Sequence, residues 1–423
     1  MKEDVLPEGW EIKKLESLAD ILDFQRKPIN SKEREKRIQG KSDNKLFPYY
    51  GATGEVGKID DYLFNEELVA LGEDGVPFLD FNKDKAYMLY GKTWVNNHAH
   101  VLRAKKGITE NKFLYYFLNQ FDYRPYVHGG IRLKLTQAHM RKIPVITPPL
   151  PEQQYLSQKL TALLDEVAQT KQRLEAIPAL LKKFRQSVLA DAVSGRLTEE
   201  NADKWNTQPL KSLTTKIGSG STPKGGNDVY KDSGIPFVRS LNIHTHFIKY
   251  EDLVFIDEVQ AEKLKNVKIE ENDVLLNITG ASIGRVNIAP KEFVNGRVNQ
   301  HVAIIRLKQE ALLPTFLHLV LASPKFQKWI EGENYGTTRQ ALTKGMLEIL
   351  EIHYPDIATQ TQIVQKVETY FALADEIETQ VKAALENVNL FTQSILAKAF
   401  SGELSAAWRK ENSQLIQIRN NNE

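Results

Sequence analysis

The chain has 423 residues, a formal net charge of +2 and no cysteine. This length allows about two to four domains with buried cores, and the missing cysteine excludes disulfides, thiolate zinc sites and cysteine nucleophiles. Glu3, Asp4, Glu8, Glu11 and Glu16 open the chain without an apolar segment, and no apolar run approaches 18 residues, so we expect a cytoplasmic protein without a secretory signal or a membrane-spanning helix.

The first globular stretch, residues 20–150, is predicted to mix strands and helices. Short apolar strands are expected at residues 68–71 and 99–102, and a single helix at 111–120 follows them. A lone helix after scattered strands indicates an α+β fold and argues against a doubly wound sheet. Residues 26–45 carry eight basic and three acidic side chains, which suits either a loop that faces phosphates or an ordinary solvated surface loop.

Residues 152–195 and 359–402 differ in composition from the rest of the chain, with few glycines and many Ala, Leu, Gln and Glu. Apolar residues recur alternately four and three apart, a pattern typical of a coiled coil, and the simplest arrangement pairs these two helices. Both helices are predicted to end at a Ser-Gly pair, where Gly195 and Gly402 can adopt the left-handed cap conformation. Pro178 is expected to kink or restart the first helix. The expected seam comprises Leu156, Leu160, Leu163, Val167, Thr170, Leu174, Ile177, Leu181, Phe184 and Val188, with Ile363, Val367, Tyr370, Ala374, Ile377, Val381, Ala384, Val388, Phe391 and Ile395 in the second copy.

The second globular stretch, residues 205–355, also predicts α+β structure, with strands at 273–278, 285–288 and 298–307 and a helix at 314–322. Two glycine-rich turns, residues 51–57 and 279–284, resemble dinucleotide-binding fingerprints. Neither is followed by a helix whose N-terminus could meet a pyrophosphate, so we do not expect nucleotide binding. His98 with His100, and His244 with His246, could each share a strand face, but no third metal ligand is apparent.

The two halves of the chain repeat one another. An offset of 207 carries residues 184–197 onto 391–404 with many identities, and it carries the loop at 129–136 onto 336–343. Other islands match at offsets of 195 and 203, the latter pairing Asn97 and His98 with Gln300 and His301. Almost no correspondence exists between these islands, which indicates a shared scaffold with two different variable surfaces or neutral drift after duplication. A two-copy chain can approximate a two-fold symmetric body, which suits duplex DNA.

Taken together, these motifs resemble the specificity subunit of type I restriction-modification enzymes across essentially the whole chain. The resemblance rests on residues 6–10 (LPEGW), 48–54 (PYYGATG), 73–75 (EDG), 143–153 and 184–197 with its repeat. Residues 356–360 depart from the Pro-Leu-x-Glu-Gln run that this family usually has before the second helix. No methyltransferase or nuclease motif is present, so the residues indicate a binding protein. The resemblance implies a non-catalytic subunit that binds DNA.

The resemblance implies an asymmetric, bipartite DNA site whose halves are read by two target recognition domains. These domains are residues 1–150 and 201–355. The helices at 151–200 and 356–405 would form an antiparallel coiled coil that sets the length of the unspecified spacer between the two half-sites. Residues 406–423 would be a tail. Partners would be double-stranded DNA, two modification subunits and two restriction subunits, with no membrane. S-adenosylmethionine, ATP and Mg would reside on those subunits, and no cofactor or metal on this chain. The alternatives are a coiled-coil adaptor that binds proteins, and an oxidoreductase that uses the turn at 279–284.

Candidates for DNA contact are basic, polar or aromatic residues of the variable regions. Arg132 and Arg339, in the repeated loops, could instead tie each loop to its helix. In the first region the candidates are Arg26, Lys27, Arg34, Arg37, Tyr49, Tyr50, Lys92, His98, Arg132 and Lys134. In the second they are Ser219, Ser221, Thr222, Lys224, Arg239, Arg285, Gln300, His301, Thr337, Thr338, Arg339 and Gln340.

Overall fold

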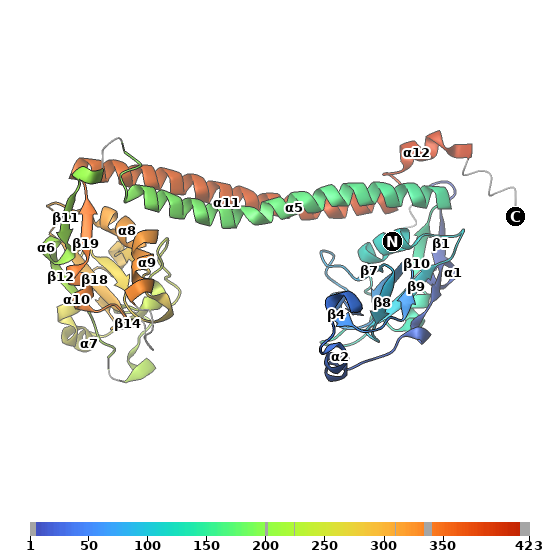
Figure 1. Cartoon of the computed structure of the whole chain (residues 1–423), viewed down its shortest axis with the longest axis horizontal. Coiled ribbons are helices and arrows are strands. Elements are labelled where there is room, and N and C mark those ends of the chain that lie inside the picture. The colour runs from blue at the N-terminus through green and yellow to red at the C-terminus, as the bar shows by residue number, and fades with distance from the viewer. Residues whose placement is uncertain (1–5, 199–201, 224, 309, 334–340, 415–423) are drawn as a thin grey trace. The chain divides into compact units, whose positions relative to one another are not determined.

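A computed structural model describes residues 6–198, 202–223, 225–308, 310–333 and 341–414. The chain divides into two compact units (Figure 1). Unit 1 consists of residues 1–175 and 382–423, and unit 2 consists of residues 176–381. The predicted contact residues Lys224, Thr337, Thr338, Arg339 and Gln340 lie outside the described residues.

The described residues of unit 1 form three sheets. A two-stranded antiparallel ribbon pairs β1 (Glu11–Lys14) with β10 (Pro144–Thr147). A four-stranded antiparallel sheet has the order β2-β9-β6-β7, and a second four-stranded sheet has the order β4-β3-β8-β5 with β3 and β8 parallel. The strand bounds are β2 Ala19–Ile21, β3 Phe47–Gly51, β4 Gly54–Ile59, β5 Phe64–Asn65, β6 Leu68–Gly72, β7 Ala86–Leu89, β8 Lys92–Val95 and β9 Ala99–Ala104.

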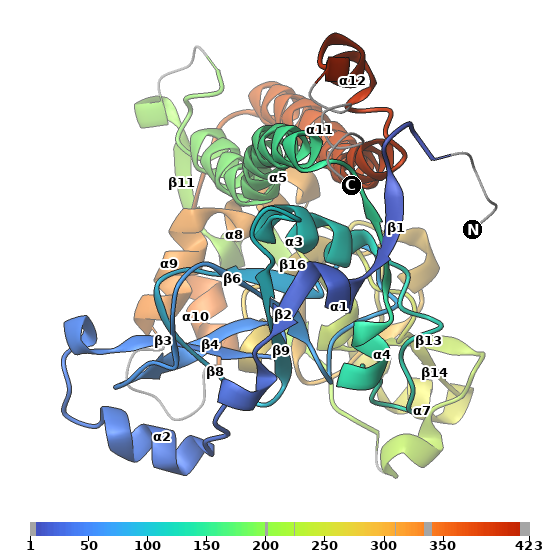
Figure 2. The same cartoon turned by 90° about the vertical axis from the view of Figure 1, so that its right-hand side faces the viewer.

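Helix α3 (Asn111–Gln120) provides the main core contact of unit 1. Its Phe113 and Phe117 are buried among residues of β6 and β9 on one side and Phe400 on the other. The apolar face of α3 therefore packs between the sheet and the long helices (Figure 2). Shorter helices of this unit are α1 (Leu15–Leu18), α2 (Ser31–Ile38), α4 (Gln137–Arg141) and α12 (Ala406–Glu411).

Unit 2 repeats this topology although its sequence hardly matches between the conserved islands. A ribbon pairs β11 with β19, an antiparallel sheet has the order β12-β18-β15-β16, and β14-β13-β17 repeats the mixed sheet with its parallel pair. The strand bounds are β11 Asn206–Pro209, β12 Thr214–Ser219, β13 Ile235–Val238, β14 Val254–Ile256, β15 Val274–Asn277, β16 Val286–Ile288, β17 Arg297–Val298, β18 Val302–Leu307 and β19 Glu351–Tyr354. The helices are α6 Leu210–Leu213, α7 Glu258–Lys263, α8 Pro314–Ala322, α9 Pro324–Glu333 and α10 Lys344–Ile349.

The two long helices are α5 (Leu150–Ala192) and α11 (Ile357–Phe400). Within unit 1, Leu156 and Leu160 near the start of α5 share a core with Ile395 and Ala399 near the end of α11. Within unit 2, Val188 near the end of α5 shares a core with residues near the start of α11. In each unit the helices therefore pair antiparallel, as expected, and the predicted α+β fold with two repeated units and a long helical pair is confirmed.

Three details of the helices bear on the sequence predictions. Gly195 and Gly402 have φ values of +78° and +81°, so the left-handed caps are confirmed. The first helix does not restart at Pro178, because the proline lies inside one continuous element, Leu150–Ala192. The expected seam is only partly buried. Phe184 packs edge to face against Tyr370 with 6.1 Å between the ring centroids, yet the two residues are 38% and 39% exposed, and Phe391 is 58% exposed.

A buried glutamine fixes the start of each long helix. Gln153 donates to the carbonyls of Pro148 and Ile108 and accepts from Thr109, and Gln360 donates to the carbonyls of Pro355 and Ala311. Gln360 also accepts from the Leu313 amide. The unusual residues before α11 therefore still build the same junction, and the Asp356 side chain caps the helix by accepting from the Thr359 amide at 2.8 Å.

Candidate nucleic-acid interface

Two carboxylates at the end of β6 organise the loops of unit 1. Glu73 accepts from Arg26 at 2.9 Å and from Lys134 at 3.0 Å, so it joins two predicted contact residues that lie far apart in sequence. Burial alone would raise the pKa of Glu73, but the hydrogen bonds from Arg26 and Lys134 outweigh it and hold the pKa below its ordinary value. The Lys134 side chain remains 51% exposed while it makes this contact.

Asp74 plays the same part for the next pair of residues. It accepts from His98 Nδ1 at 2.9 Å and from Arg132 Nη2 at 2.6 Å. The loop that carries Arg132 is a small hairpin, because the amide of His128 donates to Lys134 at 3.1 Å and the reverse bond measures 2.9 Å. Arg132 is thus tied to the end of β6, yet its side chain is 64% exposed and can also meet a ligand.

His100 and Asp23 form a hydrogen-bonded pair beneath the residues that Glu73 and Asp74 hold. His100 is 1% exposed, and its ring nitrogens face the Asp23 carboxylate at 2.6 Å and the Leu135 carbonyl at 2.9 Å. Both of these neighbours are hydrogen-bond acceptors. Burial alone would raise the pKa of Asp23, but its contacts with His100, the Val101 amide and Arg26 lower it overall. The predicted pairing of His98 with His100 is thereby resolved into two separate carboxylate contacts.

Arg34 and Arg37, two further basic residues of the segment 26–45, pack against the mixed sheet β4-β3-β8-β5. Arg34 lies over the ring of Tyr49 at 4.8 Å, and Arg37 lies over Trp94 at 5.1 Å and bonds to Asp60 at 2.6 Å. These cation–π contacts hold α2 on the sheet. Tyr49 is only 4% exposed, which leaves it little surface for a ligand.

Three further candidates of unit 1 have different surroundings. Tyr50 stacks on Tyr87 at 5.4 Å between ring centroids. Lys92 is exposed and lies over Tyr62 at 4.8 Å, and the exposed Lys27 side chain has no hydrogen-bond partner among the described residues.

In unit 2 the structure gathers Thr222, Gln300 and His301 with Thr279. The Thr222 hydroxyl donates to Gln300 Oε1, Gln300 Nε2 lies 3.0 Å from His301 Nε2, and His301 Nδ1 is hydrogen-bonded to the Thr279 hydroxyl. Thr279 follows β15 much as Asp74 follows β6. The matching histidines, His98 and His301, therefore have equivalent places and different partners.

The other candidates of unit 2 do not join this cluster. Arg239 donates to the Asp252 carbonyl at 2.6 Å and lies over the Tyr230 ring at 5.3 Å. Arg285 is half-buried between a short turn and β16, while Ser219 at the end of β12 and Ser221 are exposed. No group of three His, Cys, Asp or Glu residues among the described residues is placed to hold a metal ion.

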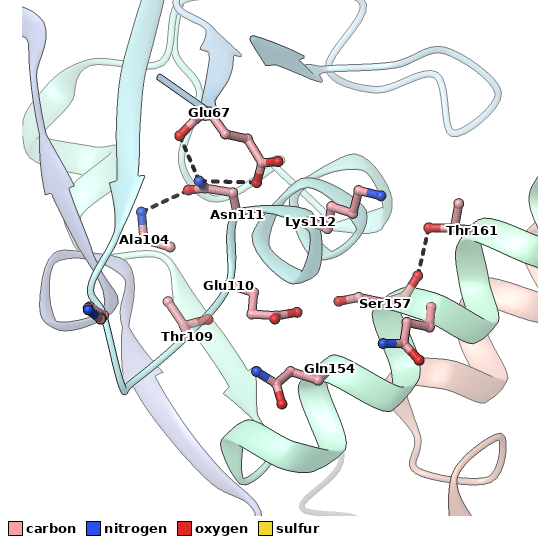
Figure 3. A pocket seen from close by; sticks show the side chains of 11 residues that line it. Glu67, Ala104, Thr109, Glu110, Asn111, Lys112, Gln154, Ser157 and Thr161 are labelled. Carbon is pink, nitrogen blue, oxygen red and sulfur yellow. Dashed lines mark hydrogen bonds between the residues drawn. The ribbon is translucent and has the colours of Figure 1, made fainter. Parts of the chain in front are cut away.

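A polar cleft of about 680 Å³ lies between α3 and the start of α5 in unit 1 (Figure 3). Its walls carry both acidic and basic groups, including Glu110 and Lys112, together with two glutamines. The Ser157 hydroxyl is buried there without a hydrogen-bond partner among the described residues. None of the predicted contact residues lines this cleft.

Sequence reasoning missed the residues that hold the predicted contact residues in place. Asp23, Asp74 and Thr279 were not predicted to bind the contact residues. Glu73 and Asp74 nevertheless belong to the motif at residues 73–75 on which the family resemblance partly rests. The offset that pairs His98 with His301 was the available signal, because residues kept through a divergent region have a reason to be kept. Among the described residues, no helix is both long enough and apolar enough to cross a bilayer.

The chain resembles proteins of known class over most of its length. The family model described as Type I restriction modification DNA specificity domain matches residues 7–179 and 202–387. The chain is 39% identical over 292 residues to the EcoBI specificity subunit of Escherichia coli, covering 64% of this chain and 61% of that relative, less than two thirds of its length. It is 33% identical over 336 residues to the EcoKI specificity subunit of Escherichia coli strain K12, covering 76% of this chain and 71% of the relative.

Solved structures agree in fold. A structure from work on complex assembly and conformational transition of the type I R-M system has a TM-score of 0.67 at 16% identity, covering 95% of this chain and 100% of that chain. The HsdS subunit of Thermoanaerobacter tengcongensis has a TM-score of 0.59 at 17% identity, covering 95% and 99%. Both the matched family model and the EcoKI relative cover most of the chain, which therefore belongs to the type I restriction modification DNA specificity family.

Proposed function

We propose that this chain is the non-catalytic DNA-reading subunit of a cytoplasmic type I restriction-modification enzyme. In this proposal each unit reads one half of an asymmetric, bipartite sequence. One observation carries it. In both units a histidine contacts a residue just after one strand of the antiparallel sheet, β6 in unit 1 and β15 in unit 2. The partner is Asp74 for His98 and Thr279 for His301. A common scaffold with different polar groups at one place is what two different half-sites require.

The exposed groups around Glu73 and Asp74 suit a nucleic acid. Arg132, Lys134 and His98 are 64%, 51% and 41% exposed at their side chains, and the carboxylates that hold them are only 13–17% exposed. Donors therefore face outward while the acceptors lie beneath them. Such a surface can meet phosphates and base edges with its side chains already ordered. Arg26, Lys27, Arg34, Arg37, Tyr50 and Lys92 would contribute around it, as would Ser219, Ser221, Thr222, Arg239, Arg285, Gln300 and His301 in unit 2; Tyr49 is too buried for direct contact.

The proposal extends to the tandem helices and their partners. Phe184 and Phe391 occupy equivalent positions in the two repeats and are both exposed, and Tyr370 and Leu373 add exposed apolar surface on α11. Apolar residues exposed at repeated positions favour docking of two copies of one partner. We assign these positions to two modification subunits, which would bring S-adenosylmethionine and the methyltransferase site. Two restriction subunits would supply ATP- and Mg-dependent chemistry, and the helices would set the spacer between half-sites.

Methylation mapping tests this function directly. The chain would be expressed with its modification subunits in a host without other adenine methylation, and genomic DNA would be read by long-read sequencing. A bipartite motif that disappears when the gene for this chain is deleted supports the proposal. Methylation that is independent of this chain, or that lacks a two-part motif, contradicts it. The control strain carries the modification subunits alone.

A further inference from the structure

One carboxamide on the surface of unit 2 is held by hydrogen bonds on both of its polar atoms. Gln300 is exposed, yet its Oε1 accepts from the Thr222 hydroxyl and its Nε2 meets His301 Nε2 at 3.0 Å. Exposed glutamine side chains usually sample many rotamers, and ordering one costs conformational entropy. Here the protein orders the side chain before any ligand arrives.

The hydrogen-bond chain that holds Gln300 has a single consistent direction. The Thr222 hydroxyl donates to Oε1, the amide N–H donates to His301 Nε2, and the other ring nitrogen, Nδ1, donates to the Thr279 hydroxyl. The backbone of His301 is also anchored, because its amide donates to the Asn299 side chain at 3.0 Å. The orientation of the carboxamide is therefore fixed, with the oxygen toward Thr222 and the nitrogen toward His301.

The loop that carries Thr222 is fitted closely against the same strand. Gly220 donates its amide to the Asn299 carbonyl at 3.1 Å, and a Cβ at position 220 would lie 1.7 Å from the Val298 carbonyl oxygen. Only glycine allows this approach. The local backbone thus places the Thr222 hydroxyl beside residue 300.

Each polar atom of the Gln300 carboxamide keeps capacity for an outside partner. The amide nitrogen has two protons and the oxygen two lone pairs, and the protein uses one of each. What remains is one donor and one acceptor on the same exposed carboxamide. In the major groove, adenine presents N7 as an acceptor and N6 as a donor, and it is the base that a glutamine side chain pairs with at both atoms. Guanine offers two acceptors and does not match.

Resting on the proposed function, we propose that Gln300 is a specificity-determining residue that reads one adenine in the half-site bound by unit 2, with Thr222 and His301 as positioning residues. The equivalent residue of unit 1, Asn97, is exposed and its side chain has no hydrogen-bond partner among the described residues. Unit 1 therefore offers a carboxamide at the same place without the device that orders it. Asn97→Ala is the matched control for the other half-site.

The test compares methylated motifs and duplex affinities for the assembled complex of this chain with its modification subunits. Gln300→Ala should relax one A·T position in one half-site and lower discrimination there by about 5- to 150-fold, which corresponds to about 1–3 kcal/mol. Gln300→Glu should move the preference at that position toward cytosine, whose N4 amino group donates to a carboxylate. Thr222→Val should lower discrimination at the same position only, and the thermal unfolding midpoint should not change in these variants.

A base analogue isolates the contact itself. A duplex with 7-deazaadenine at that position lacks the N7 acceptor, so it should bind the native complex more weakly and the Gln300→Ala complex no more weakly than unmodified DNA. Equal losses in both proteins would overturn the inference, as would a Gln300→Ala motif unchanged at every position. A native complex that has no bipartite motif rejects the proposed function as well. A native motif that is insensitive to Gln300 rejects this inference alone.

Discussion

Glu152 is expected to hold the start of α5 to the C-terminal helix α12 and to the first residues of unit 1. Its carboxylate is fully buried and accepts from Trp10 Nε1 at 2.9 Å, from the Ser405 hydroxyl at 2.6 Å and from Arg409 at 2.7 Å. Removing one partner of a buried pair costs about 3–5 kcal/mol when the other charge stays buried. Arg409 is 17% exposed at its side chain, so water can reach it in part, and we expect Glu152→Ala to cost about 2–3 kcal/mol.

Urea unfolding with hydrogen exchange resolved along the chain would measure this change. The expected result is a lower midpoint for unit 1 and faster exchange of the α12 amides, because Arg409 loses its anchor. The repeat supplies the control, since position 359 is Thr where the first copy has Glu152, and the Trp205 indole nitrogen is buried without a partner among the described residues. Thr359→Ala should change stability by less than about 1 kcal/mol. A Glu152→Ala protein with native stability and a protected α12 would refute the reasoning.

Four further outcomes are expected. Exchanging residues 20–145 for those of a relative should change one half of the methylated motif, and a change in both halves would contradict independent reading. Inserting four residues after Glu175 adds about 6 Å of helix, so the unspecified gap should lengthen by about one to two base pairs in sequenced motifs; an unchanged gap in an active protein would oppose a spacer role. Arg132→Ala should weaken cognate DNA binding by about 1–3 kcal/mol in a salt-dependent titration, whereas a lower melting temperature with unaltered affinity would leave Arg132 a loop anchor. Because the pKa of Glu73 is depressed, its contribution to stability is present above pH 4.5 and lost as the pH falls through the pKa of the folded state. Glu73→Gln should therefore be less stable than the native protein at pH 7 in urea unfolding, and the two free energies of unfolding should converge in acid. A constant difference down to pH 3 would exclude this linkage.

The sequence was sufficient for those elements whose pattern is local and long. The predicted helices at 152–195 and 359–402 correspond to α5 (Leu150–Ala192) and α11 (Ile357–Phe400). The turn at residues 279–284 leads into strand β16, as the residues after it indicated. These signals need only neighbours along the chain, namely a seven-residue apolar repeat and a glycine turn followed by alternating residues.

The remaining features depend on contacts between distant segments. Phe184 fits the heptad, but Arg185 takes the more buried place because Asp375 lies 2.5 Å away on α11 and Glu378 lies 3.0 Å away. No periodicity reveals that ion pair. The strand order of unit 2 likewise escaped prediction in detail, because long-range pairing is not encoded in short windows of sequence.

The contrast between retained and altered residues explains how one duplicated scaffold can serve two half-sites. Gln153 and Gln360 donate to equivalent backbone carbonyls in the two copies, and without these donors the buried carbonyls at the helix start would be left unpaired at a cost in stability. His98 and His301 are also retained, but their partners became a carboxylate in one copy and a hydroxyl in the other. In unit 1, Asp74 binds Arg132, and the neighbouring Glu73 binds Lys134. In unit 2, the neutral Thr279 hydroxyl ends the chain of hydrogen bonds that orders Gln300. The same imidazole position thus supports charge in unit 1 and directional hydrogen bonding in unit 2.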